Sequence, residues 1–188
     1  MTVPADTPIL AFAGQRRIAH GLIGEALPAI HDAAGEAGLL VFDAVSGRVI
    51  DLDLRGSVAE ALARLRPAPE PEKRGPGRPR LGVLPREVTL LPRHWDWLAA
   101  QPGGASVALR KLVEAALKEA EGPDRARRAK DATYRLMTTL AGDLPGYEEA
   151  TRMLFAGDWT AFDAAVEGWP EDVREAVRST ADPAWRNG

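Results

Sequence analysis

The feature that most constrains the fold is a proline-rich and basic stretch near the middle of the chain, residues 67–80, with the sequence PAPEPEKRGPGRPR. Five of its fourteen residues are proline, which lacks a backbone N–H and cannot continue a helix or a central strand. Such a composition favours an extended, solvated backbone. The sequence therefore predicts a linker at residues 67–85 that divides the 188-residue chain into separate parts.

Residues 1–66 alternate between short apolar runs and turn residues, a pattern typical of a small α+β domain. The β-rich runs form two predicted hairpins, the first turning through Gly14 and Gln15. A helix is predicted after each hairpin, and the second begins at Ser57, where Glu60 completes a capping box. The predicted order is ββαββα, with strands at residues 9–13, 16–20, 39–42 and 48–54 and helices at residues 23–36 and after Ser57.

Residues 86–120 have the pattern of one strand followed by two helices. Glu87 to Leu90 alternate between polar and apolar, and Leu91-Pro92 ends the strand and begins a helix. Pro102-Gly103-Gly104 breaks that helix, and Ser106 is expected to cap a second one. The second helix carries an apolar stripe at three- and four-residue spacing, formed by Leu109, Leu112, Val113, Ala116, Leu117 and Ala120.

This order of elements resembles the ribbon-helix-helix family of transcriptional regulators over residues 86–118. In that family two chains pair their single strands into a ribbon that enters the major groove, and the first amides of the second helix bind phosphate. The resemblance implies a homodimer that contacts DNA through Arg86, Thr89 and the backbone around Ser106. The residues that it assigns to dimerisation are Val88, Leu90, Leu109, Leu112, Val113 and Leu117.

Two strand registers stay open. If Glu87 and Thr89 face the DNA, an acidic side chain meets the phosphates where the family presents basic or amide groups. A shift by one residue turns Arg86, Val88 and Leu90 toward the DNA, which improves the charge but exposes apolar groups. In either register the segment can serve dimerisation while the basic arm contacts DNA.

Residues 73–80, KRGPGRPR, resemble the AT-hook, a basic arm that enters the minor groove of A·T-rich DNA. Narrow A·T-rich minor grooves concentrate negative potential and attract inserted arginine. The resemblance departs from the hook at Pro76, where an arginine usually stands, and a charged linker is the alternative interpretation. The DNA contacts that the resemblance implies are Lys73, Arg74, Arg78 and Arg80.

Residues 121–188 show helical periodicity throughout and predict a bundle of about four short helices. The charge differs along the chain: residues 71–130 carry thirteen Lys/Arg against seven Asp/Glu, whereas residues 131–188 carry five against eleven. A basic middle beside an acidic end suggests that one surface meets a polyanion. The chain has no cysteine, no signal-peptide pattern and no span long enough to cross a bilayer, so a cytoplasmic location is expected.

Residues with catalytic or metal-binding chemistry do not form a recognisable motif. His20, His31 and His94 lack metal-ligand spacing, and no P-loop, dinucleotide fingerprint or nucleophile elbow is present. Asp51 and Asp53 share a strand face and could hold a cation or act as acid and base, but a solvated face is the commoner cause. We therefore predict no catalytic, cofactor or metal site.

The tryptophans offer a further possible contact with nucleic acid, because an indole ring can stack on an unpaired base. Their helical spacing instead predicts Trp95 in the core and Trp97 at an interface. Three further stretches are GPGRPRLGV, REVTLLPRHWDWLAAQPGGASVALRKLV and AGDLPGYEEATRMLFAGD. Through them nearly the full length resembles a bacterial family, domain of unknown function 2239, which implies no activity.

Together these features predict a homodimeric, non-enzymatic protein that binds double-stranded DNA, either as a transcriptional regulator or as a nucleoid-associated factor. The alternative is a protein-interaction adaptor, such as an antitoxin-like module, whose acidic outer segments bind another protein. A third hypothesis, an enzyme with a carboxylate site in the N-terminal domain, requires Asp51, Asp53 and His20 to converge in one pocket.

Overall fold

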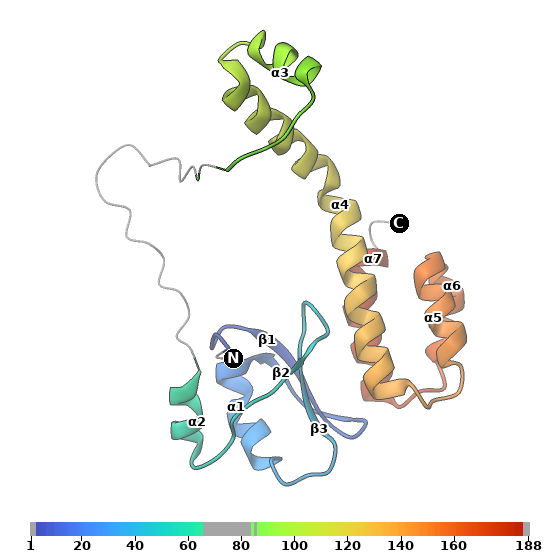
Figure 1. The fold of residues 1–188 in the computed structure, drawn as a ribbon. Helices are drawn as coiled ribbons and strands as arrows, with labels where there is room; N and C mark the ends of the chain where they lie inside the picture. The colour runs from blue at the N-terminus through green and yellow to red at the C-terminus, as the bar shows by residue number, and fades with distance from the viewer. Residues whose placement is uncertain (1–2, 66–83, 85, 186–188) are drawn as a thin grey trace. The chain divides into compact units, whose positions relative to one another are not determined.

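The protein has an α+β fold, with a small antiparallel sheet near the N-terminus followed mainly by helices (Figure 1). The computed structural model describes residues 3–65, 84 and 86–185. The chain forms two compact units: residues 1–69 together with 123–188, and residues 70–122. The boundary between the units at residues 122 and 123 falls within one long helix, α4 (Gly104–Ala141).

The sheet contains four antiparallel strands in the order β2-β1-β3-β4. Both predicted hairpins are confirmed, and the first turns through Gly14, whose φ of +60° suits glycine. The strands are β1 (Pro8–Ala13), β2 (Arg16–Leu22), β3 (Leu39–Asp43) and β4 (Val49–Ile50).

Strand β4 is much shorter than the run predicted at residues 48–54. The chain leaves the sheet after Ile50, and Asp53 makes local bonds instead: its carboxylate accepts from the backbone N of Arg55 at 3.2 Å and from the Arg55 guanidinium at 2.7 and 2.8 Å. An aspartate that bonds its own neighbouring backbone competes with strand pairing. The predicted alternation therefore overestimated the strand.

The two N-terminal helices begin where the sequence places them. Helix α1 (Ile23–Asp32) tolerates Pro28 but ends four residues before the predicted end at Glu36. Helix α2 (Val58–Arg64) has the predicted capping box, in which Glu60 N donates to Ser57 Oγ at 3.3 Å and Ser57 N donates to Glu60 Oε2 at 2.7 Å. The ββαββα order of this part is confirmed.

Helix α4 differs most from prediction, because its 38 residues combine the second helix of the central segment and the first helix of the C-terminal bundle. Pro123 lies inside it, where the missing N–H removes one bond without ending the helix. Asp158 caps the following short helix as predicted, accepting from Ala161 N at 3.0 Å. The remaining helices are α5 (Tyr147–Ala156), α6 (Trp159–Val166) and α7 (Glu171–Trp185).

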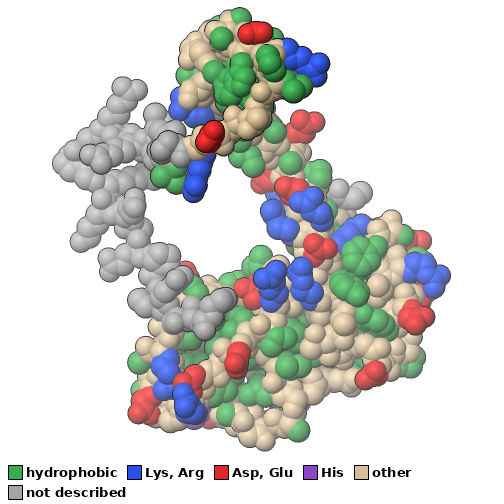
Figure 2. All heavy atoms as spheres, in the orientation of Figure 1, with side chains coloured by type: hydrophobic (Ala, Val, Ile, Leu, Met, Phe, Trp, Pro, Cys, Tyr) green, Lys and Arg blue, Asp and Glu red, His purple; other side chains and the backbone are tan. Residues whose placement is uncertain are grey.

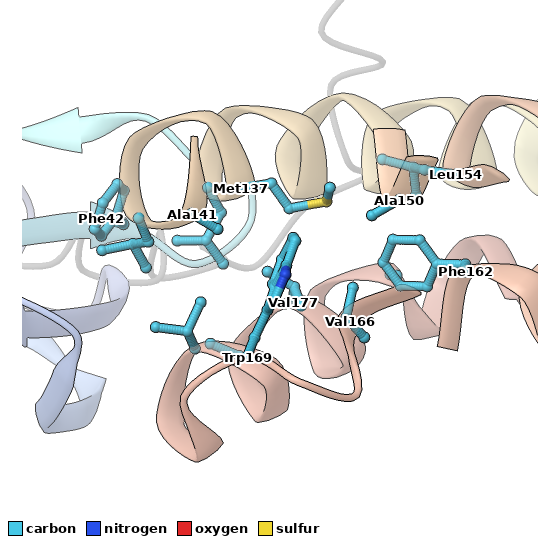
Figure 3. Packing of buried hydrophobic residues seen from close by; sticks show 14 of the residues in the cluster. Phe42, Met137, Ala141, Ala150, Leu154, Phe162, Val166, Trp169 and Val177 are labelled. Atoms are coloured by element: carbon cyan, nitrogen blue, oxygen red, sulfur yellow. The ribbon is translucent and has the colours of Figure 1, made fainter. Parts of the chain in front are cut away.

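Alternate side chains of β1 point to opposite faces of the sheet, and both faces are covered. Ile9 and Ala11 pack with residues of α1, whereas Phe12 packs with the C-terminal helices. Figure 3 shows Phe42 of β3 in the same cluster as Met137 of α4. Residues 1–66 and 121–188, which the sequence pattern treats as separate domains, thus share one hydrophobic core.

Within the described ranges, no helix combines the length and apolar character needed to cross a bilayer.

Candidate nucleic-acid interface

The second unit is built around α3 (Pro92–Ala99) and the N-terminal part of α4. As predicted, α3 begins at Pro92 directly after Leu91, because proline fits the first helical position. The turn that follows contains Gly103, with a φ of +86°. At this φ only glycine is unstrained, so the turn that separates the helices depends on it.

Ser106 does not cap α4. The helix begins at Gly104, whose φ of +74° ends the turn, so Ser106 is the third residue of the helix and its side chain is exposed. With Ser106 as the cap the first helical residue would be 107, so the paired glycines allow the helix to start three residues earlier than predicted. The amides at residues 105–107 still lie in the first turn, where backbone N–H groups have no intrahelical partner.

The stretch from Arg86 to Leu91 forms no strand in the described single chain. The ribbon strand of a ribbon-helix-helix protein pairs with the strand of a second chain. One chain alone therefore does not test the predicted strand. Arg86 and Thr89, two predicted DNA contacts, are both exposed.

Very little of the second unit is buried. Among its described residues, 84 and 86–122, the only buried hydrophobic side chains are Leu98 and Ala108. Two such side chains bury far too little apolar surface to stabilise a folded unit alone. The described helices therefore require a covering surface.

The apolar stripe of α4 is open to solvent. Every residue from 110 to 119 is exposed, and the predicted dimerisation residues Leu112, Val113 and Leu117 are 48%, 54% and 61% exposed. Leu109, one turn earlier, is half-buried. A stripe with this spacing is the face that a helix normally buries against another element.

The segment before α4 adds to the same uncovered apolar surface. Val88 and Leu91 are each about half exposed, and Leu90 is half-buried. Trp95, which the sequence places in the core, is 40% exposed in the single chain, and Trp97 is 52% exposed. Figure 2 shows hydrophobic side chains gathered over α3. Contiguous exposed apolar surface is a common feature of interaction sites.

The charge of the described part of this unit is balanced. Residues 84 and 86–122 contain five Lys/Arg and five Asp/Glu. The basic excess of the central segment therefore belongs largely to the arm at residues 73–80 and to α4 beyond residue 122. The arm's predicted DNA contacts, Lys73, Arg74, Arg78 and Arg80, lie outside the described residues.

The residues of the enzymatic hypothesis do not all converge. Asp51 and Asp53 line one cavity of about 450 Å³, but His20 is on β2, at the opposite edge of the sheet from the strand that precedes them. Asp53 forms ion pairs with Arg55 at 2.7 Å and Arg64 at 3.5 Å. Hydrogen bonds from Arg55 hold the pKa of the Asp53 carboxyl far below its usual range, so this group stays ionised and serves as an ion-pair partner.

The histidines are also separate from one another. His31 Nε2 lies 2.8 Å from the carbonyl oxygen of Gly56, and His94 receives a long contact of 3.5 Å from Arg93 Nε. In the described part of the chain, no group of three or more His, Asp or Glu side chains is arranged to hold a metal ion.

Comparison with known proteins gives one match. The model of a family described as "Uncharacterized protein conserved in bacteria (DUF2239)" matches residues 8–181, which include both units. No curated protein and no solved structure matches the chain.

Proposed function

The chain belongs to the DUF2239 family of bacterial proteins, and we propose that it is a homodimeric, non-enzymatic protein that binds double-stranded DNA. The observation that carries this proposal is the second unit, which has two helices with an open apolar stripe, preceded in the sequence by a basic arm. A second copy of the same unit is the occupant that fits the stripe best. It would bring a second strand to residues 86–90 as well as a second stripe.

The proposed dimer places one basic arm on each chain. Two arms double the number of cations that reach one duplex, and the second contact becomes intramolecular once the first has formed. The open stripe between Leu109 and Leu117 supports the dimer, and the arm residues Arg78 and Arg80 support the DNA contact. Regulation of transcription and organisation of the nucleoid in the cytoplasm are both compatible with this arrangement.

Fluorescence anisotropy tests the proposal. The full chain is titrated into labelled A·T-rich and G·C-rich duplexes of equal length at two salt concentrations. We expect tighter binding to the A·T-rich duplex and a steep loss of affinity with salt, because each phosphate neutralised by Lys or Arg releases a counterion. Absence of binding to either duplex at low salt would refute the proposal.

A protein-interaction adaptor is the second candidate. The same open stripe that supports a homodimer can cover a helix of a different protein, and residues 131–188 carry an acidic excess. Affinity purification from the native host distinguishes the two. Recovery of one protein at equal stoichiometry, without enriched DNA, would favour the adaptor.

A further inference from the structure

The turn between β3 and β4 is held tightly against α4. Gly47 has a φ of +65°, and a Cβ built on it would lie 2.2 Å from the carbonyl oxygen of Ala132. No side chain fits in that space. The backbone of the turn therefore contacts the backbone of α4 directly, and this contact fixes the residues on either side of Gly47.

Hydrogen bonds within the turn make it rigid. The Asp43 carboxylate accepts from Val45 N at 3.0 Å and from Ser46 N at 2.7 Å. The backbone N of Gly47 donates to the Asp43 carbonyl at 2.8 Å, and Asp43 N donates to the Arg48 carbonyl at 2.9 Å. Arg48 is thus attached to a backbone with a fixed position.

A second arginine reaches the same turn from α4. Arg135 Nη1 donates to the carbonyl oxygen of Ser46 at 2.7 Å, which orients its guanidinium beside the turn. Arg48 and Arg135 line one cavity of about 330 Å³. The other lining residues are Gly47, Val49, Tyr134, Thr138 and Thr139, so no carboxylate lines it.

This lack of a carboxylate partner is unusual in the first unit. Eight of its described arginines form ion pairs with Asp or Glu: Arg16, Arg17, Arg55, Arg64, Arg127, Arg152, Arg174 and Arg178. Within the described residues, Arg48, Arg128 and Arg135 have no such ion pair, and two of these three line the same cavity. Two arginines in the lining of one cavity, without a carboxylate among the lining residues, favour the approach of an anion.

The walls of the cavity are partly apolar. Val49 is 52% exposed and Tyr134 is 39% exposed. The ring of Tyr134 packs edge-on against Phe155, with ring centroids 5.6 Å apart. The Thr138 hydroxyl already donates to the Tyr134 carbonyl and lies 2.7 Å from the Tyr147 hydroxyl. The cavity thus has a mainly apolar wall, with two arginines among its lining residues.

We propose that this cavity binds a small organic phosphate. The phosphate oxygens accept hydrogen bonds from the guanidinium groups of Arg48 and Arg135, since arginine matches the geometry of phosphate oxygens. The apolar body of the ligand packs against Val49 and the ring of Tyr134. This site lies in the first unit and does not depend on the proposed binding of DNA.

Isothermal titration of the full chain with phenyl phosphate, inorganic phosphate and phenol tests the proposal. We expect saturable binding of phenyl phosphate, weaker binding of inorganic phosphate and none of phenol. Arg48→Ala should weaken phenyl phosphate binding by about tenfold or more, and Arg48→Lys by less, because lysine retains the charge but not the paired donors. Absence of saturable phenyl phosphate binding to the unmodified chain would overturn the proposal.

Two matched variants make the test specific. Arg152→Ala removes an arginine of the same unit that pairs with Glu149, and it should bind phenyl phosphate as the unmodified chain does. Equal loss in Arg152→Ala and Arg48→Ala would indicate general charge attraction and overturn the site. Tyr134→Ala should weaken binding of phenyl phosphate but not of inorganic phosphate.

The DNA backbone also carries phosphate groups that Arg48 and Arg135 could bind. A duplex titrated into the Arg48→Ala variant distinguishes the two sources. Unchanged affinity for the duplex, with lost affinity for phenyl phosphate, supports a site for a small ligand. If the unmodified chain does not bind phenyl phosphate and Arg48→Ala lowers the affinity for the duplex, the proposed site is wrong. Arg48 would then be a contact to the DNA backbone.

Discussion

The backbone amide of Arg17 in β2 donates to Oδ2 of Asp172 at the start of α7, at a distance of 2.9 Å. The guanidinium of the same arginine pairs with Glu175, one turn further along the helix. These bonds join residues more than 150 positions apart in the sequence. They fix the sheet to the C-terminal helices by directional contacts, in addition to the shared core.

Replacement of Asp172 should therefore destabilise the first unit. Asp172→Ala removes the acceptor of a part-buried backbone N–H, and we expect it to lower the free energy of unfolding by about 1–3 kcal/mol. Chemical denaturation followed by circular dichroism measures the change. Glu171→Ala is the matched control, because Glu171 is an exposed acid in the same helical turn. An equal effect of both variants would point to the helix dipole instead of the Arg17 bond.

The shared core predicts that the N-terminal segment does not fold alone. Without the C-terminal helices, Phe12 and Phe42 would lose the cluster that buries them completely. We expect a fragment of residues 1–65 to lack a cooperative thermal transition, whereas the full chain shows one that includes this segment. Differential scanning calorimetry of both makes the comparison. A cooperative transition in the fragment would mean that residues 1–66 are an independent domain.

Much of the local structure could be predicted from sequence, because its signals lie within a few residues. The Ser57 capping box, the Asp158 cap and the start of α3 at Pro92 all depend on neighbouring side chains. The shared core depends on distant ones. One signal for it was present: Ile9 to Ala13 is continuously apolar, as in strands that are buried on both faces. Helix α1 covers only one of those faces.

The candidate interface could be predicted from the sequence only in part. The sequence predicted the apolar stripe that includes Leu112 and Leu117, and the structure places both on an exposed helical face. Which surface covers them depends on a second molecule, and so does the pairing of residues 86–90. The cavity of Arg48 and Arg135 gave no sequence signal, because its two arginines are 87 positions apart and line one cavity only where the turn of Gly47 packs against α4.

The stability of the first unit should fall as the solution becomes acidic, in part through Asp53. Hydrogen bonds from Arg55 lower the pKa of Asp53 in the folded state, so the unfolded chain takes up the proton first. The stabilising contribution is present above the unfolded pKa of about 4 and is lost as pH falls below it. Denaturant midpoints measured between pH 6 and pH 3 should decline less steeply in Asp53→Asn than in the unmodified chain.

The ion pair with Arg55 can be separated from other acid effects by a double variant. Arg55→Gln removes the main cause of the lowered pKa of Asp53. In the Arg55→Gln background, the further change Asp53→Asn should alter the pH dependence much less than it does alone. If the two substitutions have fully additive effects, the coupling between Asp53 and Arg55 does not cause the pH dependence.

If the open stripe of α4 forms the dimer interface, a charged residue placed in the stripe should dissociate the dimer. Val113→Glu places an acid in the centre of the stripe, and burying it against a second chain would be costly. Arg110, three residues earlier, can pair with the new glutamate, so the isolated helix should not be destabilised. Analytical ultracentrifugation should show a dimer for the unmodified chain and a monomer for the variant.

A matched control for the dimer is available in the first unit. Val45 is a valine that is 66% exposed in the turn between β3 and β4, outside the stripe. Val45→Glu makes the same chemical change and should leave the dimer intact. A monomeric unmodified chain at micromolar concentration, or equal dissociation by both variants, would contradict dimerisation through α4.

Substitution of the arginines of the basic arm should abolish DNA selectivity without dissociating the dimer. In Arg78→Ala with Arg80→Ala, the two guanidinium groups proposed for the minor groove are absent, while the stripe from Leu109 to Leu117 is unchanged. We expect the preference for A·T-rich over G·C-rich duplex to disappear and the salt dependence of binding to become shallower, because fewer phosphates are neutralised. The variant should sediment as the unmodified dimer does.

Arg78→Lys with Arg80→Lys keeps the charge, so it should retain most of the salt dependence of binding. It should lose part of the A·T preference, since lysine is more strongly hydrated than arginine and enters the narrow groove less readily. A double alanine variant that keeps the full A·T preference would assign the selectivity to another part of the chain and leave the arm as a linker.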